Sequence, residues 1–155
     1  MNVGLIVVIN SFESEILKTY FITVIKELTD VKLCFVNNGS SEHVHELLTE
    51  IAEQSKNAFV VSAKKKKSSN TAIRAGARFL VSQFNLKSIG FIIAPNEFKL
   101  LDLLKTYSCN RDTIMIFNQK ELEKRSIKQT FYQRLFSVNV ILEKLNSGAE
   151  IQSAL

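Results

Sequence analysis

The stretch that decides the fold is residues 31–42, Val-Lys-Leu-Cys-Phe-Val-Asn-Asn-Gly-Ser-Ser-Glu. Its apolar first half is typical of a buried strand. The Asn-Asn-Gly at 37–39 then predicts a sharp turn, because Asn and Gly tolerate a positive φ. Ser40 or Ser41 is a suitable N-cap for a following helix, with Glu42 near the positive end of its dipole. In an α/β sheet, such a turn lies at the carboxyl end of a strand, where these folds bind their ligands.

The bulk composition is that of one globular domain: 155 residues, 46% hydrophobic and 23% charged. The apolar run at 3–9 is too short to span a membrane, and no basic leader precedes it. Cys34, in a predicted core strand, and Cys109, in a predicted loop, do not form a disulfide framework, so we expect a cytoplasmic location. The formal charge of +5 is compatible with an anionic ligand, nucleic acid or an acidic partner, and it selects none of them.

Strand and helix patterns alternate along most of the chain. Buried strands are predicted at 3–9, 31–36, 58–61, 88–93 and 113–117, and amphipathic helices lie between them, including a short one at 98–107. This alternation predicts an α/β three-layer sandwich with a mostly parallel sheet and right-handed crossovers. The strand ends at Asn10, 37–40, Ala63 and 94–97 should then share one edge.

Residues 120–146 predict a single long helix. Its apolar seam alternates spacings of four and three, which is typical of a helix that packs along its length: Phe131, Leu135, Val138, Leu142 and Leu145. We therefore divide the chain into a core at 1–118 and a C-terminal long helix and tail at 119–155. The helix would pack on the core, form a homodimer or dock a partner protein. We do not expect its basic side to bind nucleic acid, because no aromatic stacking platform accompanies it.

Four short segments, taken together, carry a family resemblance. They are Val-Val-Ile-Asn-Ser-Phe at 7–12, Val-Asn-Asn-Gly-Ser-Ser-Glu at 36–42, Ala-Ile-Arg-Ala-Gly at 72–76 and Ile-Gly-Phe-Ile-Ile-Ala-Pro-Asn-Glu at 89–97. In order and spacing they resemble the opening strand, the Asp-Asp-Gly-Ser turn, the third helix and the Asp-x-Asp strand of family 2 glycosyltransferases. The resemblance implies a GT-A-like (nucleotide-diphospho-sugar transferase-like) core that binds a nucleotide-sugar at its strand ends.

The acidic positions of that family are not acidic in this chain. The resemblance aligns Asn38 with an Asp that contacts the base, and Ile93 and Pro95 with the metal-binding carboxylates. A divalent cation prefers anionic oxygen ligands and helps to neutralise the leaving diphosphate. We therefore expect no metal cofactor and no metal-dependent catalysis. Residues 100–155 offer no catalytic base that stands out where family members carry their acceptor-binding part.

The candidate nucleotide-binding residues carry no carboxylate, and some of them have a structural alternative. They are Asn10, Ser11, Asn38, Lys64, Lys67, Arg74 and Asn96. The lysines at 64–67 could neutralise a diphosphate or form a solvated loop, and Arg74 could pair with phosphate. Asn38 could bind a base edge or satisfy its own turn. His43 and His45 diverge on a helix and cannot share a metal, so we expect them on the surface.

Three functions remain open from the sequence. The first is a glycosyltransferase-like binding or regulatory module with residual nucleotide-sugar binding and without metal-dependent catalysis. The second is an active, metal-independent glycosyltransferase that uses lysines 64–67 and Arg74. The third is a generic doubly wound nucleotide-binding module. The residues at 93 and 95 favour the first over the second, and the motif order favours both over the third.

Overall fold

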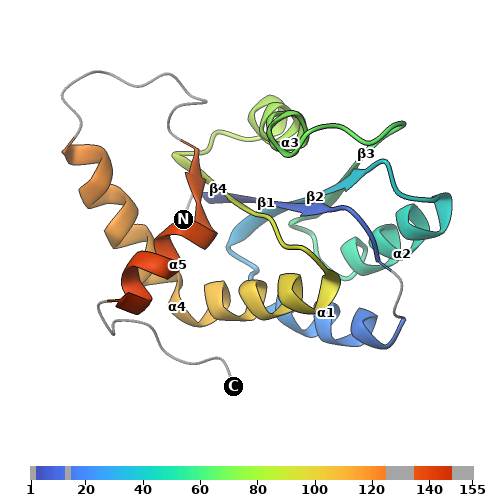
Figure 1. Cartoon of the computed structure of the whole chain (residues 1–155), viewed down its shortest axis with the longest axis horizontal. Helices are drawn as coiled ribbons and strands as arrows, with labels where there is room; N and C mark the ends of the chain where they lie inside the picture. The colour runs from blue at the N-terminus through green and yellow to red at the C-terminus, as the bar shows by residue number, and fades with distance from the viewer. Residues whose placement is uncertain (1–2, 13–14, 125–134, 148–155) are drawn as a thin grey trace.

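The computed structural model describes residues 3–12, 15–124 and 135–147, which form a five-stranded sheet with helices on both faces (Figure 1). The strand order is β3-β2-β1-β4-β5, and every neighbouring pair is parallel. The strands are β1 (Val3–Ile9), β2 (Val31–Asn38), β3 (Ala58–Ala63), β4 (Ser88–Ile92) and β5 (Phe136–Ser137). The predicted α/β sandwich with a mostly parallel sheet is therefore confirmed.

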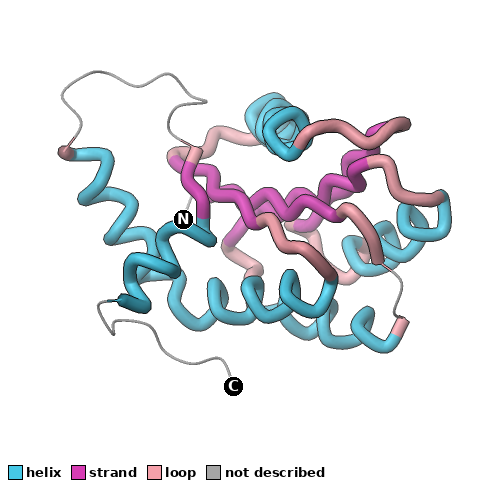
Figure 2. The backbone as a smooth tube through the Cα atoms, in the orientation of Figure 1, coloured by secondary structure: helices cyan, strands magenta, loops and turns pink. Residues whose placement is uncertain are grey.

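The helices cover the two faces of the sheet unequally. Helix α3 (Ser69–Gln83) lies on one face, and the other described helices lie on the opposite face (Figure 2). These are α1 (Ile16–Glu27), α2 (Glu42–Ala52), α4 (Glu97–Glu123) and α5 (Val138–Ser147). Because side chains alternate along a strand, β2 sends Leu33 and Phe35 to the larger core and Cys34 and Val36 to the core under α3.

Two serines set the starts of the helices that follow β2 and β3. Ser41 caps α2, its hydroxyl accepting a hydrogen bond from the Val44 amide, as expected for one of the two candidate serines. From the sequence, we predict Ser69 or Asn70 as the N-cap of the helix that follows β3. This prediction is wrong, because the N-cap is Ser68, whose hydroxyl accepts a hydrogen bond from the Thr71 amide.

Gly76 lets α3 approach the sheet closely. A Cβ at this position would lie 2.8 Å from Ile6 Cγ2 and 2.9 Å from Val36 Cγ2. A glycine in the middle of a helix weakens it by roughly 1 kcal/mol, so the sequence predicts close packing against the sheet at Gly76, and the structure confirms this packing.

The strand predicted at 113–117 is wrong, because these residues belong to helix α4. The helix continues to Glu123 through a kink at Asn110, where φ is −124° and ψ is 20°. The Asn110 side chain donates to the Thr106 carbonyl at 2.8 Å, a bond that competes with the helical ladder. Beyond the kink, Ile114 and Asn118 are buried four residues apart, which is a helical period. Cys109, expected in a loop, lies on the exposed side of α4.

The single helix predicted over 120–146 is also wrong. Helix α4 ends at Glu123, β5 and α5 cover 136–147, and the boundary predicted between 118 and 119 falls within α4. The seam residue Phe131 and residues 148–155 of the predicted tail lie outside the described residues, whereas Ser147, the first residue of that tail, ends α5. Val138, Leu142 and Leu145 are at most 8% exposed and belong to the larger core. This part of the seam is covered within the chain and is not presented to a partner.

One side chain ties α5 to the end of β4. Asn139 accepts a hydrogen bond from the Ile93 amide at 3.2 Å and donates to the Ile93 carbonyl at 2.9 Å. The pairing of β4 with β5 ends at Phe91 and Ser137, so Asn139 continues the same register with its side chain. No helix within the described ranges has the length and hydropathy needed to cross a membrane.

We expect Asn139→Ala to lower the free energy of unfolding by about 2 kcal/mol, because it leaves both backbone groups of Ile93 without this partner. For a chain of this size, that loss corresponds to a fall in Tm of roughly 4–8 °C. Urea and thermal unfolding followed by circular dichroism would measure it. Asn146→Ala, at an exposed position of α5, is the matched control. Equal stability of the two variants would show that Asn139 does not hold α5 in place.

Candidate functional site

The carboxyl ends of β1 to β4 meet at one edge of the sheet. The parallel register pairs Ile9 with Asn37 and Asn38 with Ala63, and β4 runs beside β1 in the same direction. The prediction that the four strand ends share one edge is therefore confirmed. The helices that follow each strand then decide where this edge is open.

The edge is closed between β1 and β4. A doubly wound sheet forms a ligand crevice where the order of its strands reverses, and in this sheet that point lies between β1 and β4. However, α1 and α4, which follow these strands, lie on the same face and pack against each other. The space lined by residues 8–11, 94–97 and Leu100 has a volume of about 10 Å³. That is room for about one water molecule.

The edge is open between β2 and β3. Helices α2 and α3, which follow these strands, lie on opposite faces of the sheet, so the two connections diverge (Figure 1). A crevice of about 260 Å³ lies between them, lined by Asn37, Ser40, Ser41, Glu42, His45, Ser62, Ala63 and Lys64. This volume is below the roughly 300–1,000 Å³ of most small-molecule sites. It suits one phosphate, sugar or base rather than a whole nucleotide-sugar.

Asn38 holds the end of β1 to the loop that leads to α3. Its side chain is 2% exposed and lies on the α3 side of β2, two residues after Val36. The Oδ1 atom accepts from the Lys67 amide at 2.9 Å. The Nδ2 atom donates to the Lys67 carbonyl at 2.9 Å and to Asn10 Oδ1 at 3.0 Å. Both polar atoms of the amide are therefore engaged in joining three segments of the edge.

Gly39 provides the space in which residues 64–67, the lysine loop, cross the turn. Its φ is +75°, and a Cβ at this position would lie 2.6 Å from Lys66 Cα and 2.7 Å from the Lys65 carbonyl carbon. The loop backbone is thus held against the turn, while all four lysine side chains are exposed. None of the four forms an ion pair with another described residue.

The crevice contains a histidine–serine pair that the sequence analysis missed. His45 Nδ1 lies 2.7 Å from Ser62 Oγ, and the β2–β3 register places Ser62 beside Asn37. The available signal was a serine at the next-to-last position of an otherwise apolar strand. His43 is exposed and faces Glu15, with 3.7 Å between Nε2 and Oε1. The two histidines diverge as predicted, but His45 is half-buried rather than on the open surface.

The remaining sequence-predicted residues lie in separate places. Lys64 lines the β2–β3 crevice, whereas Ser11 and Asn96 line the small space between β1 and β4. Asn96 is the N-cap of α4, and its Oδ1 accepts from the Lys99 amide at 2.9 Å. Arg74 is exposed on α3, on the face of the sheet opposite α4. The structure therefore joins Asn10, Asn38 and Lys67 by hydrogen bonds and does not gather all seven candidates.

The segment aligned with the family's metal-binding carboxylates does not fit a divalent cation. Ile93 is half-buried and packs with the core under α3, and the oxygen of Asn96 serves the helix cap. Glu97 supplies the one carboxylate of the segment and is 7% exposed. Within the described residues, no cluster of three or more His, Cys, Asp or Glu side chains could hold a metal ion. A hard cation needs several oxygen donors, which this segment does not provide.

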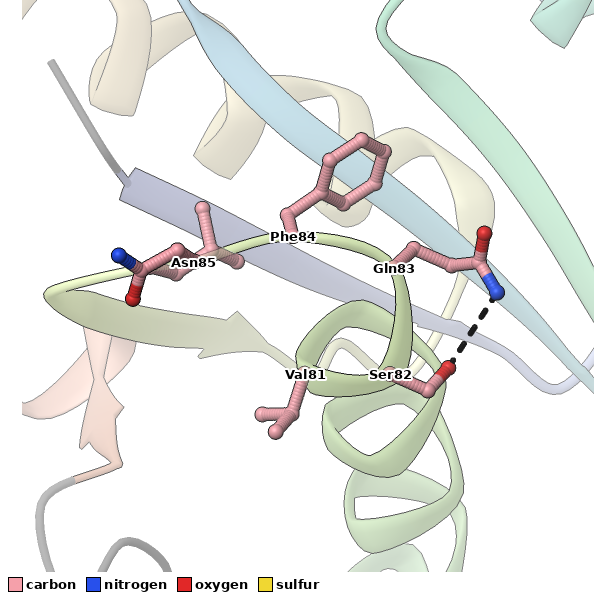
Figure 3. A pocket seen from close by; sticks show the side chains of 6 residues that line it. Val81, Ser82, Gln83, Phe84 and Asn85 are labelled. Carbon is pink, nitrogen blue, oxygen red and sulfur yellow. Dashed lines mark hydrogen bonds between the residues drawn. The ribbon is translucent and has the colours of Figure 1, made fainter.

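Two other features lie away from this edge. A hollow of about 410 Å³ lined by residues 81–86 lies where α3 leads to the amino end of β4, and Figure 3 shows its lining side chains.

Cys34 is buried in the core, as expected, and burial raises the pKa of its thiol to about 12. The thiol therefore stays protonated at neutral pH and is not a nucleophile in the folded chain.

Comparison of the chain with protein-family models, curated proteins and solved structures finds no match. The class of protein therefore rests on the fold, an α/β sandwich whose strand order 3-2-1-4-5 also occurs in doubly wound nucleotide-binding sheets. Within this fold, the β2–β3 crevice and the lysine loop beside it define the candidate site.

Proposed function

We propose that this chain is a glycosyltransferase-like binding module without metal-dependent transfer. It holds a nucleotide diphosphate or nucleotide-sugar at the carboxyl edge of its sheet, with one phosphate group of the ligand in the β2–β3 crevice and the rest outside it. The observation that carries this proposal is the β2–β3 crevice, which opens at the strand ends where α/β folds bind nucleotides. The turn at 36–42, which resembles the family's Asp-Asp-Gly-Ser turn, contributes Asn37, Ser40, Ser41 and Glu42 to its wall. The resemblance adds the expectation that the nucleotide carries a sugar.

The chemistry of the lining supports a phosphate as the group held in the crevice. Lys64 supplies an exposed ammonium group, and the amino end of α2 reaches the crevice through Ser41. His45 and Ser62 add hydrogen-bonding atoms to the wall of the crevice. Glu42 also lines the crevice and repels an anion. We therefore expect weak binding, with a Kd on the order of 0.1–1 mM, equivalent to about 4–5.5 kcal/mol.

The side chains at the end of β4 support the proposal that binding does not depend on a metal. Ile93 and Pro95 stand where the family has carboxylates, and the oxygen of Asn96 is used by the α4 cap.

A metal-independent transferase is the second candidate, and the fixed backbone of the lysine loop favours it. Four exposed ammonium groups beside the crevice could neutralise a leaving diphosphate in place of a cation. This candidate requires measurable cleavage of the sugar donor.

Calorimetric titration of uridine diphosphate, guanosine diphosphate and their sugars, with and without Mn²⁺, tests the proposal. We expect binding that Mn²⁺ does not strengthen. Lys64→Ala should weaken it about tenfold, because a hydrogen bond to a charged group contributes about 1.5 kcal/mol. Lys87→Ala removes an exposed lysine next to the amino end of β4 and is the matched control. Its affinity should equal that of the parent chain.

Each other outcome selects against the proposal. A tenfold gain with Mn²⁺ would restore a metal-dependent transferase. Release of free sugar from the donor, lost on mutation of the four lysines, would favour the metal-independent transferase. Equal binding of nucleotides with and without a diphosphate would favour a generic doubly wound module. Lack of binding to all of these ligands would remove the nucleotide from the proposal altogether.

A further inference from the structure

The charges of this chain are divided unevenly along the sequence. Residues 54–96 contain eight Lys and Arg residues and no Asp or Glu. The whole chain has 20 basic and 15 acidic residues, so the other 112 residues carry 12 basic against 15 acidic. The acid-free stretch comprises β3, the lysine loop, α3 and β4. It therefore includes the helix that covers the second face of the sheet.

Six of these basic residues form what we call the basic face. They belong to the lysine loop and to α3, and all are exposed: Lys64, Lys65, Lys66, Lys67, Arg74 and Arg78. The loop leads directly into α3, which forms the outer layer on that side of the sheet (Figure 2). Arg74 and Arg78 are four residues apart, so they share one side of the helix.

The opposite layer carries acidic residues. Helix α2 has three exposed glutamates, Glu42, Glu46 and Glu50, and its C-cap is Glu53. The sheet thus separates the basic face from the acidic helix α2, while α1 and α4 beside α2 carry charges of both signs. A broad negative surface would attract the basic face and repel α2.

The aromatic rings near α3 are occupied by packing with one another. Phe59 of β3 lies 5.7 Å from Phe79 and 5.3 Å from Phe84, measured between ring centroids. All three are partly buried, so they do not form an open platform on which nucleic-acid bases could stack. Four of the six charges are lysines, which act as hydrated point charges rather than planar forks. These features favour a surface of many equivalent anions over a partner that is read base by base.

We propose that the basic face docks onto a lipid bilayer rich in anionic phosphate headgroups, with α3 against the membrane and α2 turned away from it. Each Lys or Arg near such a surface strengthens binding by roughly fivefold at moderate ionic strength. Val81, 47% exposed, is the one large apolar side chain of α3 that solvent reaches freely, so docking is electrostatic and requires no insertion. This inference does not depend on nucleotide binding.

Sedimentation of the full chain with vesicles tests the inference, using phosphatidylcholine alone and phosphatidylcholine with phosphatidylglycerol in a two-to-one ratio. We expect binding to the anionic vesicles that is lost at high salt, and no binding to the neutral ones. The triple variant Lys65→Glu, Lys66→Glu, Arg78→Glu should lose at least about tenfold in vesicle affinity. Arg78 is the one residue of the basic face that belongs neither to the lysine loop nor to the candidate nucleotide-binding residues. Arg78→Glu alone should weaken vesicle binding about fivefold and leave nucleotide affinity unchanged.

The matched control makes the same change of net charge on the other face. Lys26→Glu, Lys99→Glu and Lys120→Glu alter exposed positions of α1 and α4, and vesicle binding should stay within about threefold of the parent chain. If both triple variants lose vesicle affinity equally, binding depends on net charge alone and not on the basic face, and the proposal is overturned. Failure of the parent chain to bind anionic vesicles would also overturn it. Tighter binding to a DNA or RNA oligonucleotide than to vesicles, lost in the basic-face variant, would assign the face to nucleic acid instead.

Discussion

Gly39→Ala is expected to displace the lysine loop and to lower the free energy of unfolding by about 3 kcal/mol. A non-glycine residue at a φ of +75° costs about 1–2 kcal/mol by itself. The new Cβ would also overlap the backbone of Lys65 and Lys66, and backbone atoms cannot rotate away as a side chain can. Urea unfolding would measure the loss, and Tm should fall by roughly 6–12 °C. Faster tryptic cleavage within the lysine loop would show that the loop has moved.

Gly4→Ala is the matched control for this prediction. A Cβ at Gly4 would lie 2.9 Å from Leu86 Cδ1 and 3.0 Å from Leu80 Cδ1, which are the ends of flexible side chains. Its φ is not positive, so we expect a loss of about 1 kcal/mol or less. If the two variants unfold at the same urea concentration, the close approach at Gly39 does not fix the loop.

Asn38→Ala is expected to cost about 3 kcal/mol, because it removes three hydrogen bonds from a buried position and each contributes about 1 kcal/mol. The amide of Lys67 would lose its partner, and the loop would no longer be tied to the end of β1. Urea unfolding measures the change. Asn96→Ala, which removes the single cap bond to Lys99, should cost only about 1 kcal/mol.

A double-mutant cycle separates the two arms of the Asn38 contacts. When Asn10 is already alanine, the Asn38 Nδ2–Asn10 Oδ1 bond is absent, so Asn38→Ala should cost about 1 kcal/mol less than in the parent chain. Strict additivity of the two substitutions would mean that this bond contributes nothing to stability. A loss for Asn38→Ala as small as that for Asn96→Ala would contradict the role of Asn38 as the link between β1 and the loop.

The sheet could be predicted because each of its first four strands is an apolar run that ends in a recognisable turn. Because side chains alternate along β2, Asn38 must face the same side of the sheet as Cys34 and Val36. That side is the one from which α3 covers the sheet. The contact between Asn38 and the loop into α3 thus follows from strand parity once the face of α3 is known.

The helix predicted at 98–107 is confirmed as the first part of α4, but its continuation beyond Asn110 could not be predicted from the local sequence. The Thr-Ile-Met-Ile-Phe run at 113–117 has the β-branched and aromatic residues of a strand, and its helical burial at Ile114 and Asn118 depends on packing in the folded chain. The face on which α4 lies has no local signal either. Because α4 joins α1, the edge is closed near Ser11 and Asn96, and two of the predicted site residues line a space too small for a nucleotide.

The β2–β3 crevice could not be predicted either, because it also depends on which face each helix covers. It depends on α2 and α3 leaving adjacent strands toward opposite faces, which is a property of the topology. His45 and Ser62 belong to different elements, and their 2.7 Å contact exists only when β3 pairs with β2. Sequence patterns identified the correct edge of the sheet, whereas the position of the opening along that edge required the fold.

Helix α3 is the described helix on its side of the sheet, and Cys34 lies beneath it. Burial keeps reagents away from this thiol and also raises its pKa. A thiol reagent therefore reacts with Cys34 only after α3 has moved away from the sheet. Cys109 is exposed on α4 and reacts without any such event. The labelling rate of Cys109 therefore reports the reactivity of the reagent, and the labelling rate of Cys34 reports local opening. The ratio of the two rates measures how often α3 separates from the strands.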